Sequence, residues 1–63
     1  MELTIRAHEL ALGDVLLEWG SVTVESVAVD PYTGAGDRVV RCLTDGGRVA
    51  MALNRLTLIN RPD

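Results

Sequence analysis

The sequence predicts an all-β domain in which five or six short strands curl into a small barrel around one core. Hydrophobic residues make up 48% of the 63 residues and charged residues 24%, which is an ordinary globular balance. The stretches rich in Val, Leu and Ile are short, and turn residues separate them, as is typical of strands. One domain spanning residues 1–63 accommodates all of these stretches.

Six segments are the expected strands. Glu2–Ala7 alternates apolar and polar residues with a period of two, the signature of a strand with one buried face. In Val22–Val29 the apolar preference changes face near Ser26, which indicates a bulge or a strong bend. The other expected strands are Val15–Trp19, Arg38–Thr44, Arg48–Leu53 and Leu56–Asn60. Residues 8–14 are compatible with a strand, a loop or a helical turn, and residues 30–37, with one Pro and two Gly, form the clearest loop.

The best-supported element is the hairpin of Arg38–Leu53. Its turn sequence Asp-Gly-Gly is favoured in two-residue hairpin turns because both central residues of such turns need a positive φ. Either Asp45-Gly46 or Gly46-Gly47 can be central, and a three-residue loop would instead place Arg41 beside Met51. We prefer a two-residue turn because both of its registers give the same two faces. The inner face then holds Val40, Cys42, Val49 and Met51, and the outer face holds Arg41, Arg48, Ala50 and Ala52.

The order of these elements resembles the SH3-like barrel. The run ELALGDVL at residues 9–16 resembles the E-L-x-x-x-G-D-x-hydrophobic run that ends the long loop of such domains, with one spacer residue fewer. Thr44–Gly47 resembles the tight distal hairpin of Tudor- and KOW-like relatives, and residues 52–56 lie where those domains place one short 3₁₀ helical turn. The chain also resembles small uncharacterised proteins of actinobacteria and their phages. These resemblances imply a fold and no function; a split barrel or a swapped β dimer is the alternative.

The aromatic content argues against the functions of the familiar relatives. The chain has one Trp, one Tyr and no Phe. Domains of the SH3 class bind polyproline helices on several aromatic side chains, and Tudor-like modules hold methylated side chains in aromatic cages. Trp19 and Tyr32 cannot build either site in full.

Catalytic, cofactor and metal sites are not expected. His8 is the only histidine, and Cys42, the only cysteine, is predicted to face inward, where a thiol behaves as a small apolar group. One His and one Cys cannot supply a zinc tetrad. Residues 34–36 form a lone G-x-G, which is a turn and not a nucleotide fingerprint. The sequence therefore predicts a protein that is not an enzyme and takes no cofactor.

The candidate partner-binding residues are aromatic or basic. Residues 1–37 hold one Arg and seven acidic residues, whereas residues 38–63 hold five Arg and two acidic residues. An arginine stripe on the hairpin could hold phosphates, an acidic partner or a nucleic-acid backbone, or could simply be a solvated face. Trp19 could pack in the core or anchor a partner, and the same two readings apply to Tyr32. The candidates are Trp19, Tyr32, Arg38, Arg41 and Arg48.

We therefore expect a non-enzymatic, protein-binding accessory module that self-associates, with a phage as one candidate origin. The first alternative is a nucleic-acid-associated module that uses the face of Arg38, Arg41 and Arg48, although the net charge of −3 and the few aromatics disfavour it. The second is a binder of a small anionic ligand at an oligomer interface. No segment approaches the roughly 20 apolar residues of a membrane helix, so the expected location is the cytoplasm.

Overall fold

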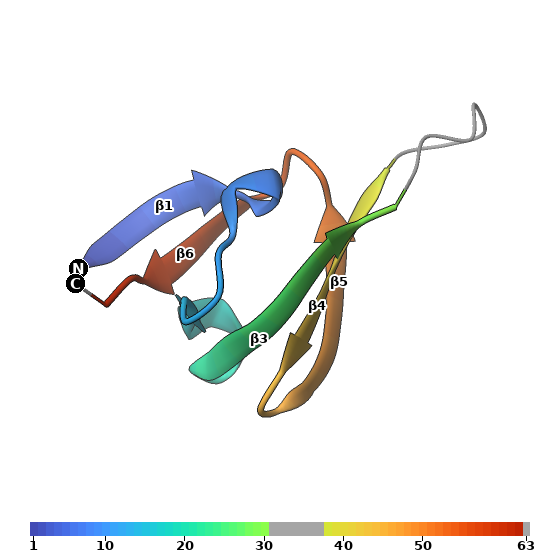
Figure 1. Ribbon diagram of the computed structural model, residues 1–63. Coiled ribbons are helices and arrows are strands. Elements are labelled where there is room, and N and C mark those ends of the chain that lie inside the picture. The colour runs from blue at the N-terminus through green and yellow to red at the C-terminus, as the bar shows by residue number, and fades with distance from the viewer. Residues whose placement is uncertain (31–37, 63) are drawn as a thin grey trace.

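The computed structural model describes residues 1–30 and 38–62. Within these residues, six antiparallel strands form one sheet in the order β1-β6-β2-β3-β4-β5 (Figure 1). They are β1 (Glu2–Arg6), β2 (Val15–Leu16), β3 (Val22–Val29), β4 (Val39–Thr44), β5 (Gly47–Ala52) and β6 (Leu56–Asn60). The all-β prediction is confirmed, and each expected strand is present with small changes of its ends, except the second, which keeps only Val15–Leu16.

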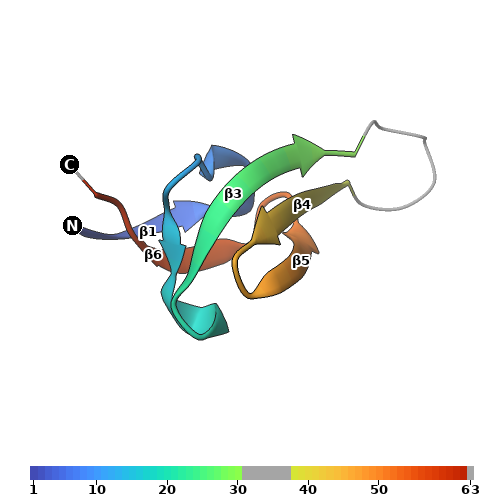
Figure 2. The same cartoon turned by 60° about the horizontal axis from the view of Figure 1, so that its bottom comes forward.

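The sheet bends because β3 takes part in both of its halves. The start of β3 pairs with β2, and the rest pairs with β4. Between Val24 and Ser26 the register with β4 shifts, which leaves Glu25 as an extra residue. The bulge predicted from the change of apolar face is therefore present. Figures 1 and 2 show the result: β1 and β6 on one side, and the β3–β4–β5 half on the other.

The core lies between these two halves. Its buried side chains come from five strands, η1 and the segment that follows η1, namely Ala7, Leu10, Leu16, Val24, Val40, Cys42, Met51 and Ile59. After the bulge Val27 also packs against this cluster, because the extra residue returns the apolar side chains of β3 to the inner face. With no Phe in the chain, this core is built almost entirely of aliphatic side chains.

The β4–β5 hairpin has the register in which Asp45-Gly46 is central. Cys42 lies opposite Val49 and Val40 lies opposite Met51. The inner face is as predicted: Val40, Cys42 and Met51 are buried and Val49 is half-buried. The outer positions, Arg41, Arg48, Ala50 and Ala52, are all exposed.

The physical reason predicted for this turn is wrong. Neither Asp45 nor Gly46 has a positive φ; the left-handed residue is Gly47, with φ of 118°. Side chains hold the turn instead. The Thr44 hydroxyl donates to the Gly47 carbonyl at 2.6 Å and accepts from the Gly46 amide at 3.1 Å. The Asp45 carboxylate accepts from the backbone amide of Thr23 at 2.8 Å, which ties the turn to β3.

Replacing Gly46 with alanine is expected to destabilise the fold by about 1–3 kcal/mol, because a Cβ at this position would collide with the Val22 side chain. Urea unfolding of Gly46→Ala, Val22→Ala and the double variant measures the coupling between the two sites. Val22→Ala makes room, so Gly46→Ala should cost clearly less in that background. If Gly46→Ala destabilised both backgrounds equally, the close contact between Gly46 and Val22 would be contradicted.

The second expected strand, Val15–Trp19, is partly wrong. Only Val15–Leu16 pair as a strand, and Leu17–Trp19 form a 3₁₀ turn, η2. Two features end the strand early. Gly20 adopts a left-handed φ of 85°, and the Ser21 amide donates to the Leu16 carbonyl and closes the turn. The Glu18 carboxylate accepts from the Leu58 amide at 3.0 Å and fixes η2 against β6.

A second 3₁₀ turn, η1 (Ala7–Glu9), follows β1, so part of the segment left open between strand, loop and helical turn is helical. The Glu9 carboxylate caps it by accepting from the Arg6 amide at 3.0 Å. The described residues thus form two single helical turns where one was expected. The predicted 3₁₀ turn at residues 52–56 is wrong: that connection is a β-turn closed by a hydrogen bond from the Arg55 amide to the Ala52 carbonyl.

Candidate functional site

A shallow groove of about 360 Å³ lies on the outer face of the β3–β4–β5 half. Small side chains form its floor because Ser26 and Ala28 of β3 and Ala50 of β5 stand on the face opposite the core. The groove is also lined by three longer side chains, those of Arg41, Leu43 and Arg48. The groove therefore combines a floor of small, mostly apolar side chains with two guanidinium groups.

Arg41 is held in place by Asp30. Its Nε donates to the two carboxylate oxygens of Asp30 at 2.9 and 3.1 Å. This contact raises the pKa of the Arg41 guanidinium further above its ordinary value. Both side chains are substantially exposed, at 63% for Arg41 and 35% for Asp30, so the pair orients Arg41 more than it stabilises the fold.

Arg48 stands on the same face, on the neighbouring strand. It pairs across the hairpin with Leu43, whereas Arg41 pairs with Ala50, so the two arginines are diagonal neighbours as expected. Within residues 1–30 and 38–62, no carboxylate lies within salt-bridge distance of Arg48. Arg48 therefore offers the groove a charge that no described acidic residue offsets.

The other expected members of the site do not join this groove. Arg38 is exposed, and its Nε donates to the Asp30 carbonyl at 3.3 Å, so it supports the same residue that orients Arg41. Tyr32 lies outside the described residues. Of the arginines in the predicted stripe, Arg41 and Arg48 line the groove, and Arg38 lies beside it.

Trp19 lies elsewhere, on η2 beside β6, and is 38% exposed. The Arg55 guanidinium lies over its ring, 5.7 Å from the centroid, which is a cation–π geometry. Trp19 is therefore neither a core residue nor part of the arginine face. Leu56 on β6, the strand that η2 contacts, is also exposed.

Two residues of the groove region were missed in the sequence. Leu43 is 46% exposed although it is a large apolar residue, and the hairpin alternation already placed it outward between Cys42 and Thr44. The sequence predicts Asp30 in the loop, yet its backbone amide donates to the Val39 carbonyl and extends the β3–β4 ladder by one pair. An acid at a strand end, diagonal to an outward arginine, was the available signal.

The candidate catalytic side chains are not arranged for chemistry in the described part of the chain. His8 is exposed on η1, and Cys42 is buried in the core, where burial raises the pKa of its thiol. A buried thiol with a raised pKa is a poor nucleophile. Across residues 1–30 and 38–62, no three His, Cys, Asp or Glu side chains gather as a metal site would need.

Among residues 1–30 and 38–62, one charged residue is fully buried. Asp14 is 1% exposed, and its carboxylate accepts from Nε and from one terminal nitrogen of Arg61 at 2.9 and 2.8 Å and from the Ala11 amide at 2.9 Å. Burial opposes ionisation of this carboxyl, but the hydrogen bonds from Arg61 and Ala11 outweigh it, so the pKa of Asp14 is lowered. Every polar contact of Asp14 is internal, so the pair is structural.

Searches of protein-family models, of curated proteins and of solved structures find no match for this chain. Among the described residues there is no helix with the length and apolar character needed to cross a membrane.

Proposed function

We propose that this chain is a non-enzymatic interaction module that binds a protein partner through the groove of the β3–β4–β5 half. The observation that carries the proposal is the exposed Leu43 and the alanine floor, placed between two arginines on one face. Apolar surface with an arginine at its edge is the composition typical of interface centres. The expected cytoplasmic location and the resemblance to phage proteins are part of this proposal.

Nucleic-acid binding is the weaker candidate. A phosphate backbone is recognised by several unpaired basic groups along a track. Here Asp30 already binds Arg41 through its carboxylate and Arg38 through its carbonyl. The net charge of −3 adds repulsion at long range. Titration with oligonucleotides at low salt distinguishes the two candidates, since a nucleic-acid module would bind them with a steep salt dependence.

The test of the proposal is capture of partners from the native host by three forms of the chain. These are the wild type, Arg41→Glu/Arg48→Glu in the groove, and Arg6→Glu/Arg55→Glu, which makes the same change of charge away from it. A groove partner should be retained by the wild type and the control, and its affinity, measured with purified proteins, should fall at least tenfold in the groove variant. Partners retained equally by all three forms would count against the groove.

Self-association is measured separately by sedimentation of the purified chain across micromolar concentrations. If the groove variant is monomeric where the wild type and the control are dimeric, the partner is a second copy. Circular dichroism of all three forms confirms that they are folded before either comparison is made.

A further inference from the structure

Strand β5 is an edge of the sheet, and half of its backbone hydrogen-bonding groups point away from β4. The Leu53 amide donates to the Arg38 carbonyl, so these two residues form a hydrogen-bonded pair. This pair fixes which residues of β5 bond to β4 and which point away from it. In an antiparallel ladder every second pair is hydrogen-bonded, so the inward-bonded residues of β5 are Met51, Val49 and Gly47. The amide and carbonyl groups of Arg48 and Ala50 therefore point outward from the sheet.

These outward groups form a short unpaired stretch next to the groove. Within residues 1–30 and 38–62, the backbone groups of Arg48 and Ala50 have no hydrogen bond outside the ladder. The stretch ends at Ala52, whose carbonyl accepts from the Arg55 amide. The side chains of Arg48 and Ala50 both line the groove. A strand added to this edge would thus lay alternate side chains beside the groove.

The charges on this edge indicate which kind of strand can pair with β5. Two copies paired through β5 around Ala50 would place both Arg48 side chains, and both Arg41 side chains, on one continuous face. Like charges on one face oppose such pairing, and charged edge residues commonly prevent it. An extended segment with carboxylates on the groove side would instead meet the unpaired guanidinium of Arg48.

We propose that β5 accepts an extended acidic segment of a partner protein as an added strand. The segment exchanges main-chain hydrogen bonds with Arg48 and Ala50, and one of its carboxylates pairs with the Arg48 guanidinium. This inference rests on the proposed function, since it names the class of partner that the groove takes. The main-chain hydrogen bonds hold the segment on β5, and the ion pair with Arg48 makes acidic sequences bind more tightly than others.

The test uses a display library of peptides of about ten residues, with Glu or Asp at alternate positions and random residues between them. Selected peptides are titrated by fluorescence polarisation against the wild type, Ala50→Pro, Thr4→Pro and Arg48→Gln. Ala50→Pro removes an outward amide while leaving the β4–β5 ladder in place, because edge strands accept Pro at such positions. Thr4→Pro is the matched control: the hydrogen bond from the Arg61 amide to the Met1 carbonyl sets the phase of β1, so Thr4 also points its amide outward, on the opposite edge.

Ala50→Pro is expected to weaken binding at least tenfold and Thr4→Pro to leave it unchanged. Arg48→Gln should weaken binding and flatten its salt dependence, and replacing the acidic residues of a selected peptide with Lys should abolish it. Amide exchange of Arg48 and Ala50 should slow in the complex.

A library without binders, or binders indifferent to Ala50→Pro, would overturn strand addition. A dimer lost in Ala50→Pro would identify a second copy as the occupant. The groove could still bind a partner in any of these cases, as the capture experiment would show.

Discussion

Replacing Ile59 with alanine is expected to remove most of the stability of this fold. Ile59 is fully buried in β6, where it lies opposite Leu3 of β1 and Leu16 of β2. Truncation of a buried Ile costs about 2–5 kcal/mol, because the cavity that remains loses its packing contacts. A chain of 63 residues has roughly 3–9 kcal/mol of stability in total. The variant should therefore melt about 10–30 °C lower.

Thermal unfolding followed by circular dichroism measures this effect. Leu56→Ala on the same strand is the control, since Leu56 is 57% exposed and its truncation should change the free energy of unfolding by no more than about 0.5 kcal/mol. Ile59→Val, which removes one methylene, should lie between the two. Similar melting temperatures for Ile59→Ala and Leu56→Ala would mean that the core is not organised around β6.

Replacing Asp14 with alanine is the second large effect, expected on the order of 2–4 kcal/mol, because this carboxylate accepts three hydrogen bonds while fully buried. The matched control is Asp30→Ala, which breaks the exposed pair with Arg41 and should cost little. Urea unfolding at pH 7 compares the two. Equal losses from both substitutions would contradict the role assigned to burial at Asp14.

The contribution of Asp14 also predicts the acid response. Its pKa in the folded chain lies below the value of about 3.9 for an unfolded chain, so the folded state favours the charged form. The stabilisation is therefore complete above about pH 4–5 and is lost as the pH falls through the folded-state pKa. The stability gap between wild type and Asp14→Ala should be constant from pH 7 to 5 and shrink below about pH 4. A gap unchanged down to pH 2 would show that the Asp14 charge contributes nothing.

Most of the strands could be predicted from the sequence, because their evidence is local. The alternation in β4 and β5 gave the inner and outer faces correctly, and the change of apolar face in β3 gave the bulge. The 3₁₀ turn η2 could be predicted only in part: Gly20 is a local signal for the end of β2, but the contact from Glu18 to the Leu58 amide, which fixes η2 against β6, joins residues 40 apart in the chain. The strand propensity of the residues alone favours a strand that continues from Val15 to Trp19.

The candidate site was predictable only in part for the same reason. Alternation placed Arg41 and Arg48 on one face, but it does not reveal that Asp30 binds Arg41, since that contact depends on the register between β3 and β4. The buried pair of Asp14 and Arg61 joins residues 47 apart and was not foreseen at all. The turn of the hairpin shows a further limit: Asp-Gly predicted its length, while hydrogen bonds of the Thr44 hydroxyl and the Asp45 carboxylate hold its backbone.

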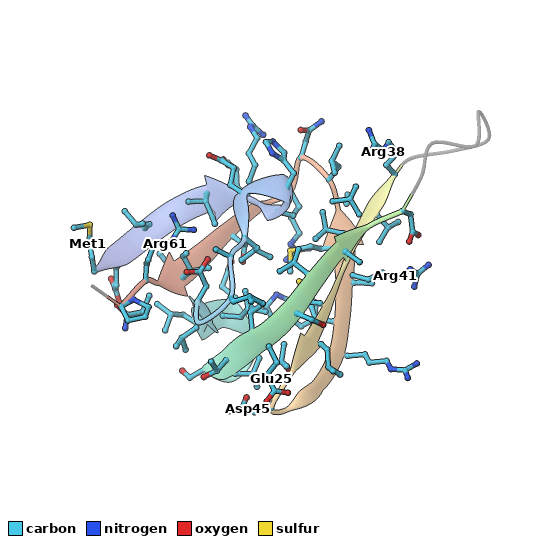
Figure 3. The ribbon with its side chains drawn as sticks, viewed as in Figure 1. Met1, Glu25, Arg38, Arg41, Asp45 and Arg61 are labelled. Carbon is cyan, nitrogen blue, oxygen red and sulfur yellow. The ribbon has the colours of Figure 1, made fainter. Side chains whose placement is uncertain are left out.

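The two ends of the described chain lie side by side, with the Met1 amino group donating to the Arg61 carbonyl at 3.0 Å. Figure 3 shows Met1 and Arg61 at one end of the molecule and Arg38 and Arg41 at the other. A unit whose entry and exit points coincide can be spliced into a surface loop of a host protein with short linkers. Carried in this way, or fused at either end, it would project its arginine-bearing groove away from the attachment point.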